Sequence, residues 1–236
     1  MTVAGAPNLA RIPAGEFLMG AQGTDPAGPH YDAKAEPDEQ PVQRVRLDAF
    51  FLAKHETTQA QWSRSTRGGA PSLYHPAHPD LIRIGKPATR LHPVERVSWR
   101  DAEEVARRQG FVLPTEAQWE YACRAGSDAV FAFGDDPAGL QGRANTPDAT
   151  AREHAIGFPE YNAWADGYVV HGPVGHFAAN AFGLYDMNGN VAEWCRDGEQ
   201  PYSVACRAHD GLREPSRHHS ATLPFMSYNP KALAAK

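Results

Sequence analysis

The chain has 236 residues, of which 42% are hydrophobic and 22% are charged, so it can bury a core as ordinary globular proteins do. Its 21 glycines, 20 prolines and five tryptophans predict a loop-rich fold and argue against a helical bundle. The net charge is −5 and basic residues are scattered along the chain, so we expect no nucleic-acid partner.

The N-terminus and the cysteines bear on the cellular compartment. Residues 1–17 lack a basic stretch followed by an apolar one, so we expect no secretory signal peptide. No apolar run approaches the roughly 20 residues that span a bilayer, so we expect no membrane association. The three cysteines, Cys123, Cys195 and Cys206, have no CxxC spacing, which argues against a disulfide scaffold or a zinc finger. With no linker or repeat, these features predict a reduced, cytoplasmic, single-domain protein.

The N-terminal part of the chain predicts short strands joined by a polar loop. Residues 11–21 predict an edge strand opened by a Pro-Ala-Gly turn, with Phe17 and Met19 on one face. The polar residues 22–41 predict a surface loop. Residues 42–58 alternate apolar and polar side chains, which predicts a hairpin or two short strands.

A helix is expected to begin after Thr57 and Thr58, because a threonine cap there precedes a polar-apolar turn. Residues 67–86 are rich in glycine, proline and histidine and have no period, which predicts a loop. Its His75 and His78 are expected at the surface rather than as ligands.

The clearest local signal lies in residues 92–111. A short strand over residues 94–97 is expected to lead into Ser98, the N-cap of a helix. Asp101 stands three residues after that cap, where a capping box places its second member. Gly110 is expected to end the helix.

The same device recurs in residues 113–126. Thr115 is the expected cap, Gln118 its capping-box partner, and Gly126 the end of the helix. Cys123 lies near the apolar face, which predicts a buried structural thiol. Beyond this helix the sequence predicts a long series of loops, which need bound ions, aromatic plugs or local hydrogen bonds to hold them.

Residues 180–195, NAFGLYDMNGNVAEWC, combine turn formers, two acids and large apolar residues in one short window. This composition predicts a loop that folds tightly back on itself and is pinned by aromatic side chains at both ends. Asp186, Asn188 and Glu193 offer oxygen donors, with loop carbonyls between them, of the kind that calcium prefers. Taken alone, the window fits an Asx-rich turn with solvated carboxylates better than an ion site.

Five strings together resemble the formylglycine-generating-enzyme (sulfatase-modifying factor) family. They are IPAGEFLMG, VRLDAFFLAKHETTQAQW, HPVERVSWRDAEEVARR, LPTEAQWEYACRAG and NAFGLYDMNGNVAEWC, in that order. The resemblance covers roughly residues 10–200 and implies one α+β domain, a loop-rich variant of the C-type-lectin fold. On this basis residues 1–219 would form the domain, incomplete at its C-terminus, and residues 220–236 a divergent tail.

The resemblance also implies two structural calcium ions, which reverses the preference for a solvated turn. At the first site Asp186 and Glu193 would supply carboxylates, and Asn188 or Gly189, with Val191, would supply backbone carbonyls. The second site would use the side chains of Asn145 and Asp166 and the carbonyls of Thr146 and Tyr168. Ligand sets made only of oxygen suit calcium and not copper or zinc.

The family's oxidase members hold copper with two nearby cysteines after an RGGS-type strand, a pair that suits soft Cu(I). After Cys206 this sequence has no further cysteine and no RGGS strand. One alignment of the tail places Arg213 and His218 where the copper cysteines belong. The other, which we prefer, has the chain depart from the family near His219. Either way the resemblance implies no copper site of this type.

Histidines could in principle replace the missing thiolates in the tail. His209, Asp210, His218 and His219 are the available iron or copper ligands there, but an exposed polar tail explains them better. Neighbouring histidines in a strand point in opposite directions, so only one of the last two could join such a site.

Three functions remain open from the sequence. The first is an oxygen-dependent oxidoreductase that acts on a peptidyl cysteine or a small thiol, with its catalytic residues unknown. The second is a non-catalytic, calcium-stabilised module that binds a peptide, a glycan or a partner protein. The third is an inactive product of a truncated or frameshifted gene. In each case we expect a monomer.

Overall fold

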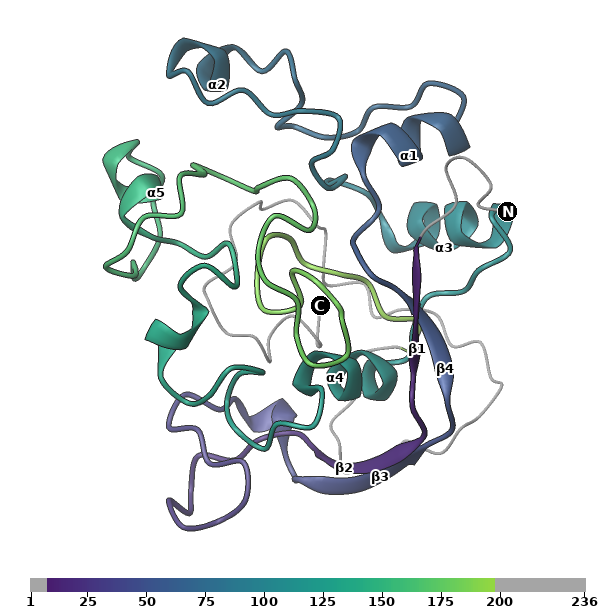
Figure 1. Ribbon diagram of the computed structural model, residues 1–236, viewed down its shortest axis with the longest axis vertical. Helices are drawn as coiled ribbons and strands as arrows, with labels where there is room; N and C mark the ends of the chain where they lie inside the picture. The colour runs from purple at the N-terminus through teal and green to yellow at the C-terminus, as the bar shows by residue number, and fades with distance from the viewer. Residues whose placement is uncertain (1–7, 198–236) are drawn as a thin grey trace.

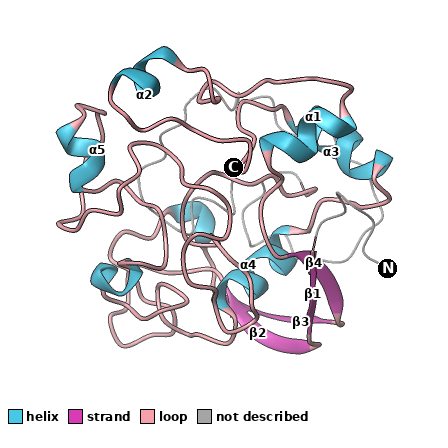
Figure 2. Ribbon diagram, turned by 45° about the horizontal axis from the view of Figure 1, so that its top comes forward, coloured by secondary structure: helices cyan, strands magenta, loops and turns pink. Residues whose placement is uncertain are grey.

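The computed structural model describes residues 8–197. Within that range most of the chain forms loops, as Figure 2 shows, with few helices and strands between them. These elements are the strands β1 (Leu9–Ile12), β2 (Gly15–Met19), β3 (Gln43–Leu47) and β4 (Phe50–Ala53), the helices α1 (Gln59–Ser65), α2 (Pro79–Arg83), α3 (Trp99–Arg108), α4 (Glu116–Arg124) and α5 (Ala149–Glu153), and two 3-10 turns at Pro37–Glu39 and Pro137–Leu140.

The strands form one bent antiparallel ribbon. β1 pairs with β4 and β2 pairs with β3, and the same register continues across the break, from Ile12 opposite Phe50 to Gly15 opposite Leu47. The expected strand opened by the Pro-Ala-Gly turn is confirmed as β2, although it ends at Met19; Pro13 cannot donate to the ladder, and the chain bends there between β1 and β2. The expectation of two short strands within residues 42–58 is confirmed.

The three predicted helix starts are confirmed. Thr58, Ser98 and Thr115 each accept a hydrogen bond from the backbone N–H three residues later, and each forms a full capping box. Gly110 follows α3 with φ of +80°, and Gly126 follows α4 with φ of +89°. Glycine reaches this left-handed region without the steric cost that other residues meet.

Two local expectations are wrong. Residues 94–97 form no strand; only an isolated bridge joins Thr58 to Pro93, and Arg96 with φ of +59° breaks the extended backbone. Residues 67–86 are not all loop, because they contain the short helix α2, whose Leu81 is buried with Tyr74. His75 and His78 are both partly exposed.

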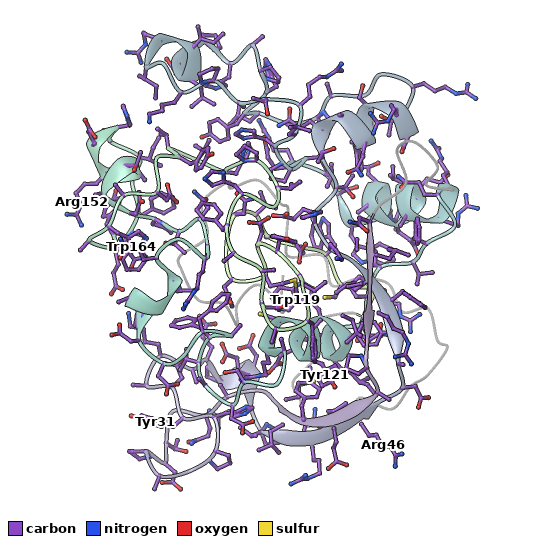
Figure 3. All side chains as sticks on the ribbon, viewed as in Figure 1. Tyr31, Arg46, Trp119, Tyr121, Arg152 and Trp164 are labelled. Atoms are coloured by element: carbon purple, nitrogen blue, oxygen red, sulfur yellow. The ribbon has the colours of Figure 1, made fainter. Side chains whose placement is uncertain are left out.

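Helix α4 is the centre of the main core. Its Trp119, Tyr121 and Cys123 pack with Ile12 of the ribbon and Leu184 of the 180–195 loop. Figure 3 shows Trp119 beneath that loop and Tyr121 turned toward β2 and β3. The predicted burial of the Cys123 thiol is confirmed.

The ribbon and α4 approach so closely that one position requires glycine. A Cβ atom at Gly15 would lie 2.2 Å from the hydroxyl oxygen of Tyr121. Helix α4 thus has the ribbon on one side and the 180–195 loop on the other, as Figure 1 shows. Among residues 8–197, no helix is long and apolar enough to cross a membrane.

Candidate functional site

The loop 180–195 is fastened to α4 by Asn180. Its side-chain oxygen accepts hydrogen bonds from the backbone N–H groups of Phe182 (3.0 Å) and Leu184 (3.2 Å). Its Nδ2 donates to the carbonyl of Ala122 in α4 at 2.8 Å. Asn180 therefore both turns the chain and ties the turn to the helix.

Aromatic residues hold the far end of the loop. The indole Nε1 of Trp194 donates to the carbonyl of Val97 at 3.1 Å, and that of Trp99 donates to the carbonyl of Cys195 at 2.7 Å. At the near end Phe182 packs against the main core. The prediction of a folded-back loop with aromatic anchors at both ends is confirmed.

The two acids of the loop are brought into one region. Asp186 adopts φ of +60°, and its Oδ2 accepts from the N–H of Gly175 at 2.7 Å. Glu193 accepts a hydrogen bond from the indole N–H of Trp119. Burial raises the pKa of both carboxyls, and the charge of Asp186 raises that of Glu193 further. Two buried carboxylates that repel each other favour a nearby cation.

A third acid, Glu56, joins them from the segment between β4 and α1. Its Oε1 accepts from Nδ2 of Asn190 at 2.9 Å. Burial, then the charges of Asp186 and Glu193, raises the pKa of Glu56 well above its usual value. Sequence reasoning missed this residue, because 134 positions separate it from Asn190 and no local pattern links them.

Several oxygens in this region lack a protein partner. Within residues 8–197, the buried Oδ1 of Asp186, Oδ1 of Asn188 and Oε2 of Glu56 accept no hydrogen bond. A buried acceptor without a partner costs free energy, and a hard cation or water satisfies it. The Nδ2 of Asn188 donates to the thiol of Cys123 at 3.3 Å.

The second predicted group also comes together. Nδ2 of Asn145 donates to Oδ2 of Asp166, and the N–H of Tyr168 donates to Oδ1 of Asp166, both at 2.8 Å. The hydroxyl of Thr146 accepts from Nδ2 of Asn162 at 2.9 Å. Burial, with a further contribution from the Asp148 carboxylate, raises the pKa of Asp166 to about 7.

Asp148 is the second acid that sequence reasoning missed. It is fully buried, and its Oδ1 caps α5 by accepting from the N–H groups of Thr150 and Ala151. Its Oδ2 accepts from the N–H of Asp166. The Asx cap ahead of α5 was the one local signal that could have found it.

Whether a metal ion fits these residues depends on the ligand atoms that the metal prefers. Among residues 8–197, no three His, Cys, Asp or Glu side chains gather in a geometry that would hold a metal ion. A calcium site made of one or two carboxylates, an amide oxygen and backbone carbonyls does not require such a group. The partnerless oxygens of Asp186 and Asn188 fit this oxygen-rich class and not a zinc or copper class.

The two described cysteines are protonated thiols. Both are buried, and burial raises the pKa of Cys123 to about 12 and that of Cys195 well above its usual value. Soft metals bind the thiolate form of cysteine, which burial disfavours at both positions. The remaining tail candidates, Cys206, His209, Asp210, Arg213, His218 and His219, lie outside the described residues.

Comparison with known proteins agrees with this architecture. Residues 2–222 match the family model of the sulfatase-modifying factor enzyme 1-like domain. A formylglycine-generating enzyme of Streptomyces coelicolor is 32% identical over 81% of this chain and 69% of that protein. An inactive C-alpha-formylglycine-generating enzyme 2 of Mus musculus is 29% identical over 83% of this chain and 70% of that protein.

A solved structure supports the fold. The structure of PvdO from Pseudomonas aeruginosa superimposes with a TM-score of 0.62 and 27% identity, over 86% of this chain and 76% of that one. The few strands and long loops of this chain agree with the α+β, C-type-lectin-like domain expected of the family. The chain therefore belongs to the formylglycine-generating-enzyme (sulfatase-modifying factor) family.

Proposed function

We propose that this chain is a calcium-stabilised binding domain whose target is a peptide segment or a partner protein. Two loop groups would each hold one calcium ion. The first would use carboxylates of Asp186 and Glu193 and carbonyls of Asn188 or Gly189 and of Val191. The second would use the side chains of Asn145 and Asp166 and the carbonyls of Thr146 and Tyr168. Calcium would neutralise the buried carboxylates and fix the loops that carry them.

The partnerless oxygen of Asp186 is the main support for calcium. Asp186 is only 6% exposed, and apart from the neighbouring carboxyl of Glu56 its Oδ1 has no hydrogen-bond partner among residues 8–197. Its other oxygen is fixed by the N–H of Gly175, so the carboxylate cannot rotate freely to find water. A cation at that oxygen removes the cost of the orphaned acceptor and of the neighbouring charge on Glu193.

The cysteine content favours binding over copper-dependent oxidation. These 236 residues contain three cysteines, and Cys123 and Cys195 are buried thiols. Burial of both of these thiols supports a binding role over a two-thiolate copper site of the family's type.

Oxidation of a peptidyl cysteine is the second candidate. It is supported by the bacterial relative, which is a formylglycine-generating enzyme, whereas the mouse relative is described as inactive. A small thiol would be an alternative substrate.

Metal analysis and one activity assay distinguish these functions. Purified protein is dialysed against metal-free buffer, and bound calcium and copper are measured by mass spectrometry and by titration calorimetry. The protein is then incubated with a CxPxR-type cysteine peptide, Cu(I) and oxygen. We expect calcium binding without aldehyde formation.

A matched pair of variants tests the assignment of the first site. Glu193→Gln should abolish one calcium equivalent, whereas Glu16→Gln, which alters an exposed acid of β2, should leave both. Aldehyde formation by the wild-type protein would overturn the binding-domain proposal. Absence of calcium binding would overturn the calcium sites.

A further inference from the structure

The two candidate calcium sites touch each other through backbone atoms. The N–H of Asn190, in the first loop, donates to the carbonyl of Asn145, a residue of the second site, at 2.9 Å. Gly189 lies against the same carbonyl, because a Cβ atom there would come within 2.1 Å of that oxygen. The position of Asn145 therefore sets the position of the backbone at residues 189–190.

A second connection runs through residues 168–175. This segment leaves the second site at Tyr168, whose N–H donates to Asp166. The N–H of Gly172 then donates to Oδ1 of Asn190 at 2.8 Å. The N–H of Gly175 donates to Asp186 of the first site at 2.7 Å. The two sites are thus joined by a direct backbone hydrogen bond and by the backbone segment 168–175, and Asn190 takes part in both connections.

We infer that these two connections couple the sites, so that calcium at one site raises the affinity of the other; this inference rests on the proposed function. Calcium at the second site would order Asn145 and residues 166–168. That order would extend directly to the carbonyl groups of residues 189–191 and to the Asp186 carboxylate. Binding of the first ion would therefore already order part of the loops, so binding of the second ion would lose less conformational entropy. Thermodynamic linkage makes the effect reciprocal.

Single-site variants measure the coupling. Asp166→Asn leaves only the first site, and Glu193→Gln leaves only the second, so calorimetry returns one binding constant from each. The product of the two wild-type constants, divided by the product of these single-site constants, is the coupling factor. We expect a factor of about five to fifty, within the usual range of allosteric coupling. Independent sites would give a factor near one.

Asn190→Gly tests whether the side-chain connection carries the coupling. Asn190 is not a proposed ligand, and its φ of +73° suits glycine, so the substitution removes its bonds to Gly172 and Glu56 without backbone strain. Arg67→Gly is the matched control, because Arg67 also has a positive φ, of +55°, but lies in an exposed loop after α1.

The outcomes are distinct. Asn190→Gly, combined with each single-site variant, should still bind calcium but lower the coupling factor at least about threefold, and Arg67→Gly should retain the wild-type factor. A wild-type factor near one would overturn the coupling and leave the calcium sites intact. Unchanged coupling in a folded Asn190→Gly protein would overturn the role of that side chain. No calcium binding at all would overturn the proposed function and this inference with it.

Discussion

Replacement of Arg124 in α4 by methionine should be strongly destabilising. Arg124 and Glu120 form an ion pair at 2.7 Å, and their side chains are only 7% and 8% exposed. The guanidinium also donates to the carbonyls of Gly20 and Ala129, each at 3.1 Å. The substitution leaves a buried carboxylate without its cation and removes a donor from each carbonyl, of which that of Gly20 keeps its contact with Nδ1 of His30. Breaking a buried pair from one side costs about 3–5 kcal/mol.

Urea unfolding followed by tryptophan fluorescence measures this loss. Since a domain of this kind has roughly 5–15 kcal/mol of stability, Arg124→Met should remain measurable with a lowered midpoint. The control is Arg107→Met in α3, where the pair with Glu104 is exposed and the unfolding free energy should not change detectably. Glu120→Gln combined with Arg124→Met should recover part of the loss. A loss below about 1 kcal/mol for Arg124→Met would refute the reasoning.

Three further predictions concern the loops, a helix cap and pH. Gly189→Ala should destabilise by about 1–3 kcal/mol in urea unfolding, because its methyl group collides with a backbone carbonyl. Thr115→Ala should cost about 0.5–2 kcal/mol in the same assay, because α4 loses its capping box. Burial lowers the pKa of His92 to about 4 and that of His171 to about 3, while unfolding restores both toward 6.5. The unfolded chain therefore binds more protons below pH 6.5, and stability falls as pH falls from 6.5 toward 4. Between pH 6.5 and pH 4, the melting temperature of the wild-type protein should fall more steeply than that of a His92→Asn, His171→Asn double variant.

Each of these has a contradicting outcome. Wild-type stability in Gly189→Ala would show that the carbonyl moves away at no cost. An unchanged midpoint in Thr115→Ala would mean that packing alone holds the start of α4. The histidine comparison is made between two proteins because Asp166, whose pKa is raised to about 7, acts in the opposite direction on acidification. Parallel pH profiles for the two proteins would rule out the histidine contribution.

Local chemistry made several features predictable. A capping box spans three residues, so Thr58, Ser98 and Thr115 marked the helix starts without any tertiary information. The turn residues within 180–195 were sufficient to predict that this loop folds back on itself. Local chemistry also misled the prediction of a strand over residues 94–97. The apolar pattern there gives no sign that Arg96 adopts a positive φ.

Contacts between distant segments were beyond such reasoning. Glu56 reaches Asn190 across 134 positions, and His92 meets His171 at 2.9 Å across 79. The local sequence around these residues does not predict either contact. Both contacts depend on how α4 and the bent ribbon place the surrounding loops.

The sequence by itself determined the helix caps, the loop-rich character and the oxygen donors of residues 180–195, because turn and cap preferences act within a few residues. Only the tertiary structure decided that Glu56 joins those donors, that Asp148 joins Asp166 in the second group, and that Asn145 supports Gly189 by direct contact. The physical reason is range: hydrogen bonds and charges act over a few ångströms in space, whatever the separation along the chain.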